Sequence, residues 1–448
     1  QQRAIESVDT SNMTVGGKGN TPGPKPPPDA QPKQIIDPIP DHLLRVPGFI
    51  GEVMDHTLET APYPNPVMAF AGAMSLQAVL AGRKVRDTGN IRTNLYTLGL
   101  AGSGSGKNQP RKVNRHILTE AGLPSYIGAD QLSSGEGVQD AMFAAPSMLW
   151  QIDEIDTLMG AMKSSKDARY EGIASTLLIL YTSSDSGFSM RRKANDANPG
   201  EINQPNMVLF GTAIPSHFYA SLSEKMLTNG LFARMFILQS GSRPAGQEGG
   251  VIDPSDRVME TARWWAGYQP SRGNLASGNP IPAKVGRSQA GDDLAREFRV
   301  MADEEYAKAE TAFNDAAMAA WARANEMARK LALIYAVSES HDRPEVGKAA
   351  MAWASEVVMH QTKSMLAMAE NYSAVSEFDE ASKQLVRHMQ SWGGGAWVPH
   401  SWLLAKMRNL DGKSFKRLAD TMVERGEIES EMTPTGGRPG RAYRLPPE

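Results

Sequence analysis

The 448-residue sequence contains no cysteine, which excludes disulfide bonds, thiolate metal sites and cysteine nucleophiles. It has no apolar run near the roughly 20 residues that a membrane-spanning helix needs, so no membrane role is expected. The formal net charge is only −3, so any binding of nucleic-acid phosphates must depend on local basic patches. The eight histidines show no metal-ligand spacing. These features favour a cytoplasmic protein.

The length of the chain exceeds what one hydrophobic core normally organises, which favours two or three domains with connecting segments. The hydrophobic fraction of 41% and the charged fraction of 22% are ordinary for globular proteins, so a sizeable core is expected. The sequence begins with Gln1 rather than methionine, and we interpret it as a fragment of a longer protein.

Composition and periodicity divide the chain into five predicted parts. Residues 1–40 are rich in proline and glycine and cannot bury enough apolar surface to fold, so we expect a disordered linker. The next part has helical periodicity and is interpreted as an N-terminal helical collar. The remaining parts are an α/β core, a linker with a region of long helices, and a separate small domain. The four predicted boundaries give the ranges 41–93, 94–245, 246–372 and 373–448.

The α/β core is predicted from four short apolar runs that alternate with amphipathic stretches. This pattern is typical of a mainly parallel sheet whose strands are connected by helices. The predicted strands span residues 94–101, 147–152, 207–213 and 234–239.

A glycine-rich turn follows the first predicted strand and precedes a predicted helix. Its glycines let backbone N–H groups point at phosphate oxygens, and Lys107 supplies a charge for the β and γ phosphates of ATP. Asn108 stands where serine or threonine normally gives Mg²⁺ a hydroxyl, although an amide oxygen also ligates this metal. The alternative is a flexible Gly/Ser loop. The predicted ATP-binding residues are Gly102, Ser103, Gly104, Ser105, Gly106, Lys107 and Asn108.

Two adjacent carboxylates, Asp153 and Glu154, follow the second predicted strand. The carboxyl ends of parallel strands are where α/β proteins bind ligands. We predict that Asp153 holds Mg²⁺ together with Asn108, and that Glu154 orients or deprotonates the attacking water. A second carboxylate favours hydrolysis over transfer to a small acceptor. The alternative is an exposed acidic turn.

The third and fourth strands supply two more candidate residues. Thr212 ends the third strand and is predicted to sense the γ-phosphate, or else to cap the segment that follows. Arg234 stands at the start of the fourth strand. With these motifs, residues 41–345 resemble hexameric AAA+ helicases of the superfamily-three kind, and more closely the helicase halves of phage and plasmid primase-helicases. The resemblance implies that Arg234 is an arginine finger for the neighbouring subunit's ATP; the alternative is pairing with a local carboxylate.

The residues that flank the turn-rich segment 195–200 are typical of a β-hairpin. In the resembled family such a hairpin projects into the central channel and contacts a single DNA strand. Arg191, Arg192 and Lys193 would then bind phosphates without reading sequence. The alternative is a solvated charged face.

The C-terminal part has predicted helices at 378–392, 401–407 and 414–425, followed by two short strands around residues 436–440. This order resembles winged-helix domains that bind duplex DNA. Lys413, Lys416 and Arg417 lie on the presumed recognition helix, and Arg438, Arg441 and Arg444 lie on the wing. A protein-docking role is the alternative.

Together these features predict an α/β P-loop NTPase with an AAA+/RecA-like parallel sheet, a flanking helical region and a small C-terminal winged-helix domain. The predicted function is an ATP- and Mg²⁺-dependent replicative DNA helicase motor of a phage or mobile element. It would form a homo-oligomeric ring, a hexamer by the resemblance, in the cytoplasm of a bacterium or infected host. A primase domain or protein is a possible partner. Alternatives are a DNA-associated ATPase switch without unwinding, and a non-hydrolysing DNA-binding initiator, which Asn108 favours.

Overall fold

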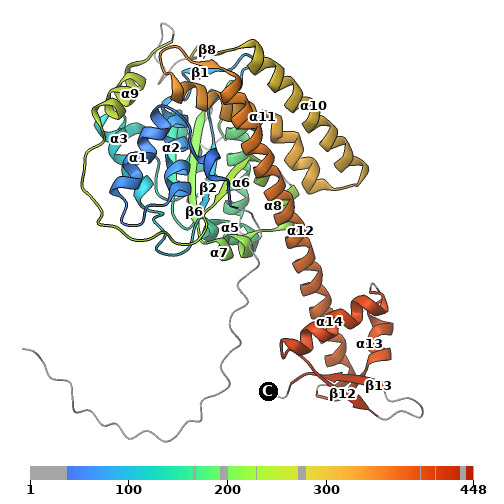
Figure 1. Ribbon diagram of the computed structural model, residues 1–448. Helices are drawn as coiled ribbons and strands as arrows, with labels where there is room; N and C mark the ends of the chain where they lie inside the picture. The colour runs from blue at the N-terminus through green and yellow to red at the C-terminus, as the bar shows by residue number, and fades with distance from the viewer. Residues whose placement is uncertain are drawn as a thin grey trace, which may run out of the picture. The chain divides into compact units, whose positions relative to one another are not determined.

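The computed structural model describes residues 38–164, 168–191, 200–228, 230–270, 279–393, 395–408, 410–433 and 440–446. They form a mixed α/β structure around a four-stranded parallel sheet, as Figure 1 shows. The predicted α/β class with a parallel sheet is therefore confirmed. Residues 1–37 of the predicted linker lie outside the described residues.

The parallel sheet has the strand order β3-β6-β2-β7, so the third strand along the chain lies between the first two. All residues of these strands are buried, as expected for a sheet covered on both faces. The predicted strands are confirmed to within two residues at each end. The bounds are β2 (Tyr96–Leu100), β3 (Ser147–Ile152), β6 (Asn206–Ala213) and β7 (Met235–Gln239).

The two faces of the sheet belong to different apolar clusters because successive side chains of a strand point to opposite faces. Leu149 and Val208 pack with the helices α1, α2 and α3, whereas Trp150 and Leu209 pack with α4, α5 and α6. The first set is α1 (Phe49–Thr60), α2 (Pro66–Leu80) and α3 (Gln109–Glu120). The second set is α4 (Gly135–Ala144), α5 (Ile155–Ser164) and α6 (Ala168–Thr182).

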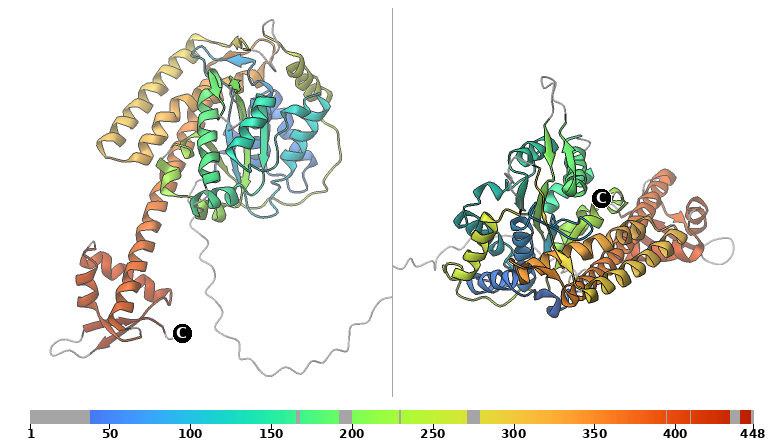
Figure 2. Two further views of the ribbon diagram at one scale, coloured as in Figure 1. Left: turned by 180° about the vertical axis from the view of Figure 1, so that it is seen from behind. Right: turned by 90° about the horizontal axis from the view of Figure 1, so that it is seen from above.

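Smaller elements precede, connect and follow the strands of the sheet. Two of them, β4 and β5, form an antiparallel hairpin that projects from the α/β part, as Figure 2 shows. This confirms the predicted pairing for the described residues. The elements are η1 (Asp41–Leu44), η2 (Pro124–Tyr126), η3 (Ser183–Asp185), β4 (Gly187–Ser189), β5 (Glu201–Asn203), α7 (Pro215–Ser221), α8 (Glu224–Thr228), η4 (Phe232–Arg234) and α9 (Asp256–Gly267).

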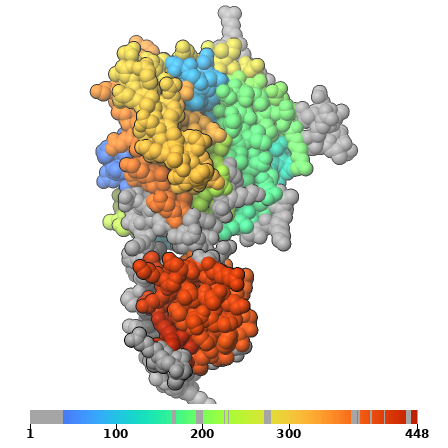
Figure 3. All heavy atoms as spheres, turned by 90° about the vertical axis from the view of Figure 1, so that its right-hand side faces the viewer, coloured from blue at the N-terminus to red at the C-terminus, as the bar shows by residue number. Residues whose placement is uncertain are grey.

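Three long helices follow, as the periodicity predicts: α10 (Gln289–Thr311), α11 (Asp315–Glu339) and α12 (Lys348–Gly393). Helix α10 lies on the outer surface in Figure 3. Helix α12 runs through residue 373, where we expected a domain boundary, because no glycine or proline interrupts it before Gly393. The long helices also share an apolar cluster with the N-terminal helices; Phe70, for example, meets the ring of Trp353 at 6.3 Å.

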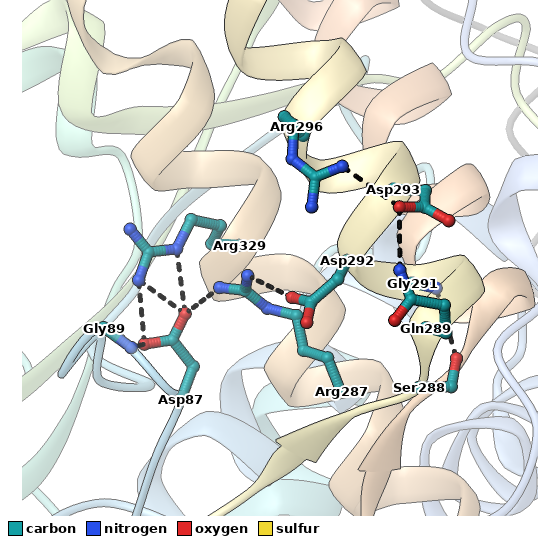
Figure 4. A network of polar contacts seen from close by, with 10 residues as sticks. All are labelled: Asp87, Gly89, Arg287, Ser288, Gln289, Gly291, Asp292, Asp293, Arg296 and Arg329. Atoms are coloured by element: carbon teal, nitrogen blue, oxygen red, sulfur yellow. Dashed lines mark hydrogen bonds and ion pairs between the residues drawn. The ribbon is translucent and has the colours of Figure 1, made fainter.

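A buried ion-pair network joins the chain before the sheet to these long helices (Figure 4). The Asp87 side chain is 1% exposed and accepts from both Arg329, at 2.8 and 3.0 Å, and Arg287, at 2.8 Å. The backbone N–H of Gly89 donates to the same carboxylate at 2.8 Å. Short strand pairs lie beside this network: β1 (Val85–Arg86) with β8 (Ala283–Lys284), and β9 (Gly286–Arg287) with β10 (Glu345–Val346).

The C-terminal elements have their own apolar cluster, with Leu385, Phe415 and Tyr443 at its centre. The predicted order of two helices and then a hairpin is confirmed, and a short third strand completes an antiparallel sheet of order β11-β13-β12. The bounds are β11 (Val398–Pro399), α13 (His400–Lys406), α14 (Gly412–Glu424), β12 (Glu429–Thr433) and β13 (Gly440–Arg444). No helix in the described ranges combines the length and apolar character of a membrane span.

Candidate functional site

The glycine-rich segment forms the connection between β2 and α3. Gly104 and Gly106 have φ values of +67° and +78°, in the left-handed region that glycine adopts without strain. A Cβ on Gly106 would lie 2.1 Å from the carbonyl oxygen of Tyr63. The turn therefore requires glycine at residue 106 for two independent reasons.

Asn65 anchors the loop from the start of α2. Its Nδ2 donates to the carbonyl oxygen of Ser105 at 3.0 Å and to the hydroxyl of Ser240 at 2.8 Å, while its Oδ1 accepts from the N–H of Met68. Asn65 thus caps α2 and holds the loop together with the segment after β7. Sequence reasoning missed this residue, although its place next to Pro66 is a signal for a helix start.

The acidic pair lies at the end of β3, at the same edge of the sheet as the loop. Ile152 is in register with Gly211, and Gly99 is in register with Thr212, so β6 links the ends of β2 and β3. The hydroxyl of Thr212 donates to Asp153 Oδ1 at 2.8 Å. The structure therefore brings together two of the predicted site residues from neighbouring strands.

Asp153 is held in its ionised form by its surroundings. Burial raises its pKa, but the hydrogen bond from Thr212 and the positive charge of Arg111 outweigh this effect and lower the pKa below its ordinary value. The Arg111 guanidinium lies 2.7 Å from Asp153 Oδ2. The neighbouring Glu154 is exposed and has φ +50°, a strained conformation for a residue with a side chain.

The oxygen donors at this edge fit Mg²⁺. They are the carboxylate of Asp153, the amide of Asn108 and the hydroxyl of Thr212, all hard ligands. Asn108 is the N-cap residue of α3, yet its side chain makes no capping hydrogen bond. No cluster of three or more His, Cys, Asp or Glu residues suited to a metal occurs in the searched part of the chain.

Lys107 is partly buried at the end of the loop, and the predicted loop residues Gly102, Ser103 and Ser105 complete the turn with it. A second cation that sequence reasoning missed lies beside the loop: Arg243, after β7, stacks on the ring of Tyr63 at 4.0 Å. A Cβ on Gly104 would lie 3.6 Å from Arg243 Cζ.

A cavity of about 380 Å³ adjoins the first turns of α3. Its walls come from α1, α3 and residues 249–253, and they include Gln109, Val113 and His56. Burial lowers the pKa of His56, which favours its neutral ring. Val251 and Ile252 line the cavity and are exposed aliphatic side chains. Their place in a glycine-rich stretch gave only a weak sequence signal.

The side chain of Arg234 points toward the interior of its own chain, and the residue is 8% exposed. It donates to the carbonyl oxygen of Gly230 at 2.8 Å and to the hydroxyl of Thr182 at 3.4 Å, and lies over the ring of Tyr181. Burial lowers its pKa. This position gives no support to a role in the neighbouring subunit's site, and the hydrogen-bond acceptors are a carbonyl and a hydroxyl rather than the carboxylate of the alternative.

The candidate DNA-contacting residues of the hairpin are described only in part. Arg191 follows β4, has a side chain that is 74% exposed, and forms an ion pair with Glu136. Arg192 and Lys193 lie outside the described residues.

In the C-terminal part, Lys413, Lys416 and Arg417 are exposed on α14. The described wing arginines form ion pairs instead: Arg441 pairs with Asp420 and Arg444 pairs with Glu429. The ring of Trp397 lies 4.7 Å from the Arg444 guanidinium. Arg438 lies outside the described residues. Among the predicted cations of this part that the structure describes, those on α14 are therefore exposed, whereas the wing arginines are paired.

The chain matches no protein-family model, and a search of curated proteins found no match either. The functional argument therefore depends on the geometry of the site itself. Its central feature is one edge of the sheet, where three adjacent strands end. The glycine-rich loop follows β2, the carboxylate of Asp153 follows β3, and the hydroxyl of Thr212 lies at the end of β6.

Proposed function

We propose that the chain is a P-loop ATPase that acts on DNA. The observation that carries this proposal is the hydrogen bond between Thr212 and Asp153, made beside the strand that ends in the glycine-rich loop. A loop for phosphates and a carboxylate for their metal are the two parts that hydrolysis of a nucleoside triphosphate requires.

Each residue has a defined part in the proposed hydrolysis. The N–H groups of the loop and the ammonium of Lys107 bind the β and γ phosphates. Asp153 and Asn108 would hold Mg²⁺, which neutralises the phosphate oxygens when bound. Thr212 fixes the orientation of the Asp153 carboxylate through its hydroxyl. Glu154 orients the attacking water and accepts its proton.

The backbone of Glu154 supports its assignment. Non-glycine residues with positive φ cost roughly 1–3 kcal/mol and occur preferentially at functional sites, where the fold enforces them. The strained turn at Glu154 directs the chain away from β3 immediately after Asp153 and leaves the second carboxylate exposed. An exposed carboxylate at this position is accessible to water.

The cavity beside α3 is the proposed site for the base of ATP. It begins at Gln109, two residues after Lys107, so it is within reach of a nucleotide whose phosphates occupy the loop. The exposed side chains of Val251 and Ile252 would be covered by an aromatic base, which removes apolar surface from water.

DNA is the proposed partner because of α14. Its three exposed cations suit phosphate contacts from a winged-helix module, and the resemblance of residues 41–345 adds translocation by a ring-forming helicase. A DNA-associated ATPase switch without unwinding is the second candidate. The burial of Arg234 in its own chain favours this candidate, since a ring motor needs a residue that acts across the subunit interface.

A forked-duplex assay with ATP tests the proposal. The wild type should hydrolyse ATP, and both Lys107→Ala and Glu154→Gln should reduce hydrolysis by a factor of about 100 or more. Hydrolysis with strand separation supports the helicase, and hydrolysis without it supports the switch. Absence of hydrolysis in the wild type would contradict the ATPase and leave the non-hydrolysing initiator.

A further inference from the structure

A guanidinium lies between the two residues predicted to hold the metal. Arg111 Nη2 donates to Asn108 Oδ1 at 2.6 Å and to Asp153 Oδ2 at 2.7 Å. Both acceptors are the oxygens that the proposed function assigns to Mg²⁺. A positively charged group of the chain itself therefore occupies the position between the metal ligands.

The position of Arg111 on α3 makes this contact specific. Arg111 follows Asn108 by three residues, about one helical turn, so the two side chains lie on the same face of the helix. The carbonyl oxygen of Arg111 also accepts from Gln151 Nε2 at 3.2 Å, which ties its backbone to β3. The fold thus fixes both the helix that carries the guanidinium and the strand that carries its carboxylate.

The Arg111 side chain still has hydrogen-bonding capacity. It is 19% exposed, and its Nε is buried without an acceptor in the described structure. A buried donor without an acceptor costs about 1–3 kcal/mol. An additional acceptor near Arg111, such as a phosphate oxygen, would be able to remove this cost.

Charge explains what the guanidinium does at this site. A triphosphate bound in the loop places several negative charges near the ionised carboxylate of Asp153, and like charges at close range repel. Either Mg²⁺ or a cation of the protein can offset this repulsion. The Arg111 guanidinium, 2.7 Å from Asp153 Oδ2, is such a cation.

We propose that Arg111 takes the place of the metal in the metal-free site. It holds Asn108 and Asp153 in position and allows the loop to bind a nucleoside triphosphate before Mg²⁺ arrives. When bound, Mg²⁺ would be held by the oxygens of Asn108 and Asp153 and would offset the Asp153 charge, so the Arg111 guanidinium would no longer be needed for this. Arg111 is a positioning residue in this account, which rests on the proposed nucleotide site.

The test is the affinity for a fluorescent ATP analogue, mant-ATP, measured on the full chain in EDTA and in millimolar Mg²⁺. Arg111→Ala should weaken binding in EDTA by about tenfold or more, the loss expected for one charge-assisted hydrogen bond. In Mg²⁺ its affinity should remain within about threefold of the wild type, because the metal offsets the Asp153 charge.

Three further variants separate charge from structure. Arg115→Ala, on the same helix, removes an exposed pair with Asp130 and should bind like the wild type in both buffers. Arg111→Lys keeps the charge and should retain binding in EDTA, whereas Arg111→Met keeps only the length and should lose it. Adding Asp153→Asn to Arg111→Ala should restore binding in EDTA, because the uncompensated carboxylate is gone.

The inference would be overturned if Arg111→Ala and Arg111→Met lost the same affinity for mant-ATP in EDTA as in Mg²⁺, or if neither variant lost affinity in either buffer. Both outcomes would leave the ATPase proposal intact. A failure of the double variant to regain binding in EDTA would overturn it as well. If the folded wild type binds no mant-ATP in either buffer, the proposed function and this inference both fail.

Discussion

Gly106 shows how closely the loop is specified at the scale of single residues. We predict that Gly106→Ala lowers the affinity for mant-ATP by about tenfold or more, since its Cβ clashes with the Tyr63 carbonyl and its φ becomes strained. Gly122→Ala is the matched control, because Gly122 also has positive φ but has open space around its Cβ position. It should lower stability and leave the affinity unchanged; equal affinity losses in both variants would contradict the steric argument.

The buried side chain of Lys84 makes the free energy of unfolding depend on pH. It is 1% exposed and donates to the carbonyl oxygen of Trp265, and burial lowers its pKa from 10.5 to about 7. Between these two values the unfolded chain binds more protons than the folded chain, so stability rises with pH across this window. Below the folded-state pKa of about 7, the destabilisation caused by burying the charged Lys84 side chain is fully present.

We therefore expect the free energy of unfolding, measured with urea, to increase from neutral pH towards the alkaline end of that window. Lys84→Met should reduce this slope, whereas substitution of the exposed Lys348 by Met should leave it unchanged. Lys330, whose pKa burial lowers to about 8, contributes the same sign and leaves a residual slope in Lys84→Met. If Lys84→Met leaves the slope of the unfolding free energy against pH unchanged, a group other than Lys84 causes the pH dependence.

The limits of sequence-based prediction are clear for individual side chains. The places of Asp153 and Thr212 at strand ends follow from the sequence, but their contact depends on β3 and β6 being neighbours in the sheet. The inward orientation of Arg234 was not predictable, because a long side chain at a strand end can point either way. Arg111 was missed since its role depends on the distance from α3 to β3, which is a tertiary property.

At the scale of elements, the Asp87 network joins the segment before β2 to α11 and β9. We predict that Asp87→Asn lowers the free energy of unfolding by about 3–5 kcal/mol, because it leaves two guanidinium groups without their buried carboxylate. Asp293→Asn removes the exposed pair with Arg296 and should cost at most about 1 kcal/mol. Urea unfolding measures both, and similar costs would contradict the importance of burial.

Helix α14 carries the predicted contacts with duplex phosphates. Replacing Lys413, Lys416 and Arg417 by alanine should weaken DNA binding and reduce the dependence of log K on log salt by about 2 to 3. Arg441→Ala should leave this slope nearly unchanged, because its charge is already paired with Asp420. Fluorescence anisotropy over a range of salt concentrations measures the slopes, and an unchanged slope for the triple variant would contradict the assignment.

Elements were easier to predict than their arrangement. The four strands of the sheet follow from apolar runs, but the order β3-β6-β2-β7 depends on pairing between segments far apart in the chain. The sequence pattern predicts two segments where α12 is continuous, although no helix breaker lies between residues 348 and 392. A change of composition at residue 373 was interpreted as a boundary, and composition alone does not end a helix.

At the scale of the whole molecule, the role of Arg234 distinguishes a proposed ATP site completed within one chain from a site shared by two chains. Because its guanidinium hydrogen-bonds within its own chain, we expect mixtures of Arg234→Ala and wild-type protein to lose ATP hydrolysis in proportion to the variant's share. A loss steeper than dilution would show that Arg234 acts on a neighbouring subunit after all, as the resemblance to ring helicases implies.

The most direct test of the central claim is a double-mutant cycle on Lys107 and Asp153, with the affinity for mant-ATP in Mg²⁺ as the readout. If both side chains converge on one triphosphate and its metal, the two single losses should not add, and Lys107→Ala with Asp153→Asn should bind only slightly more weakly than the poorer single variant. Strictly additive losses, as for distant and independent sites, would contradict the account.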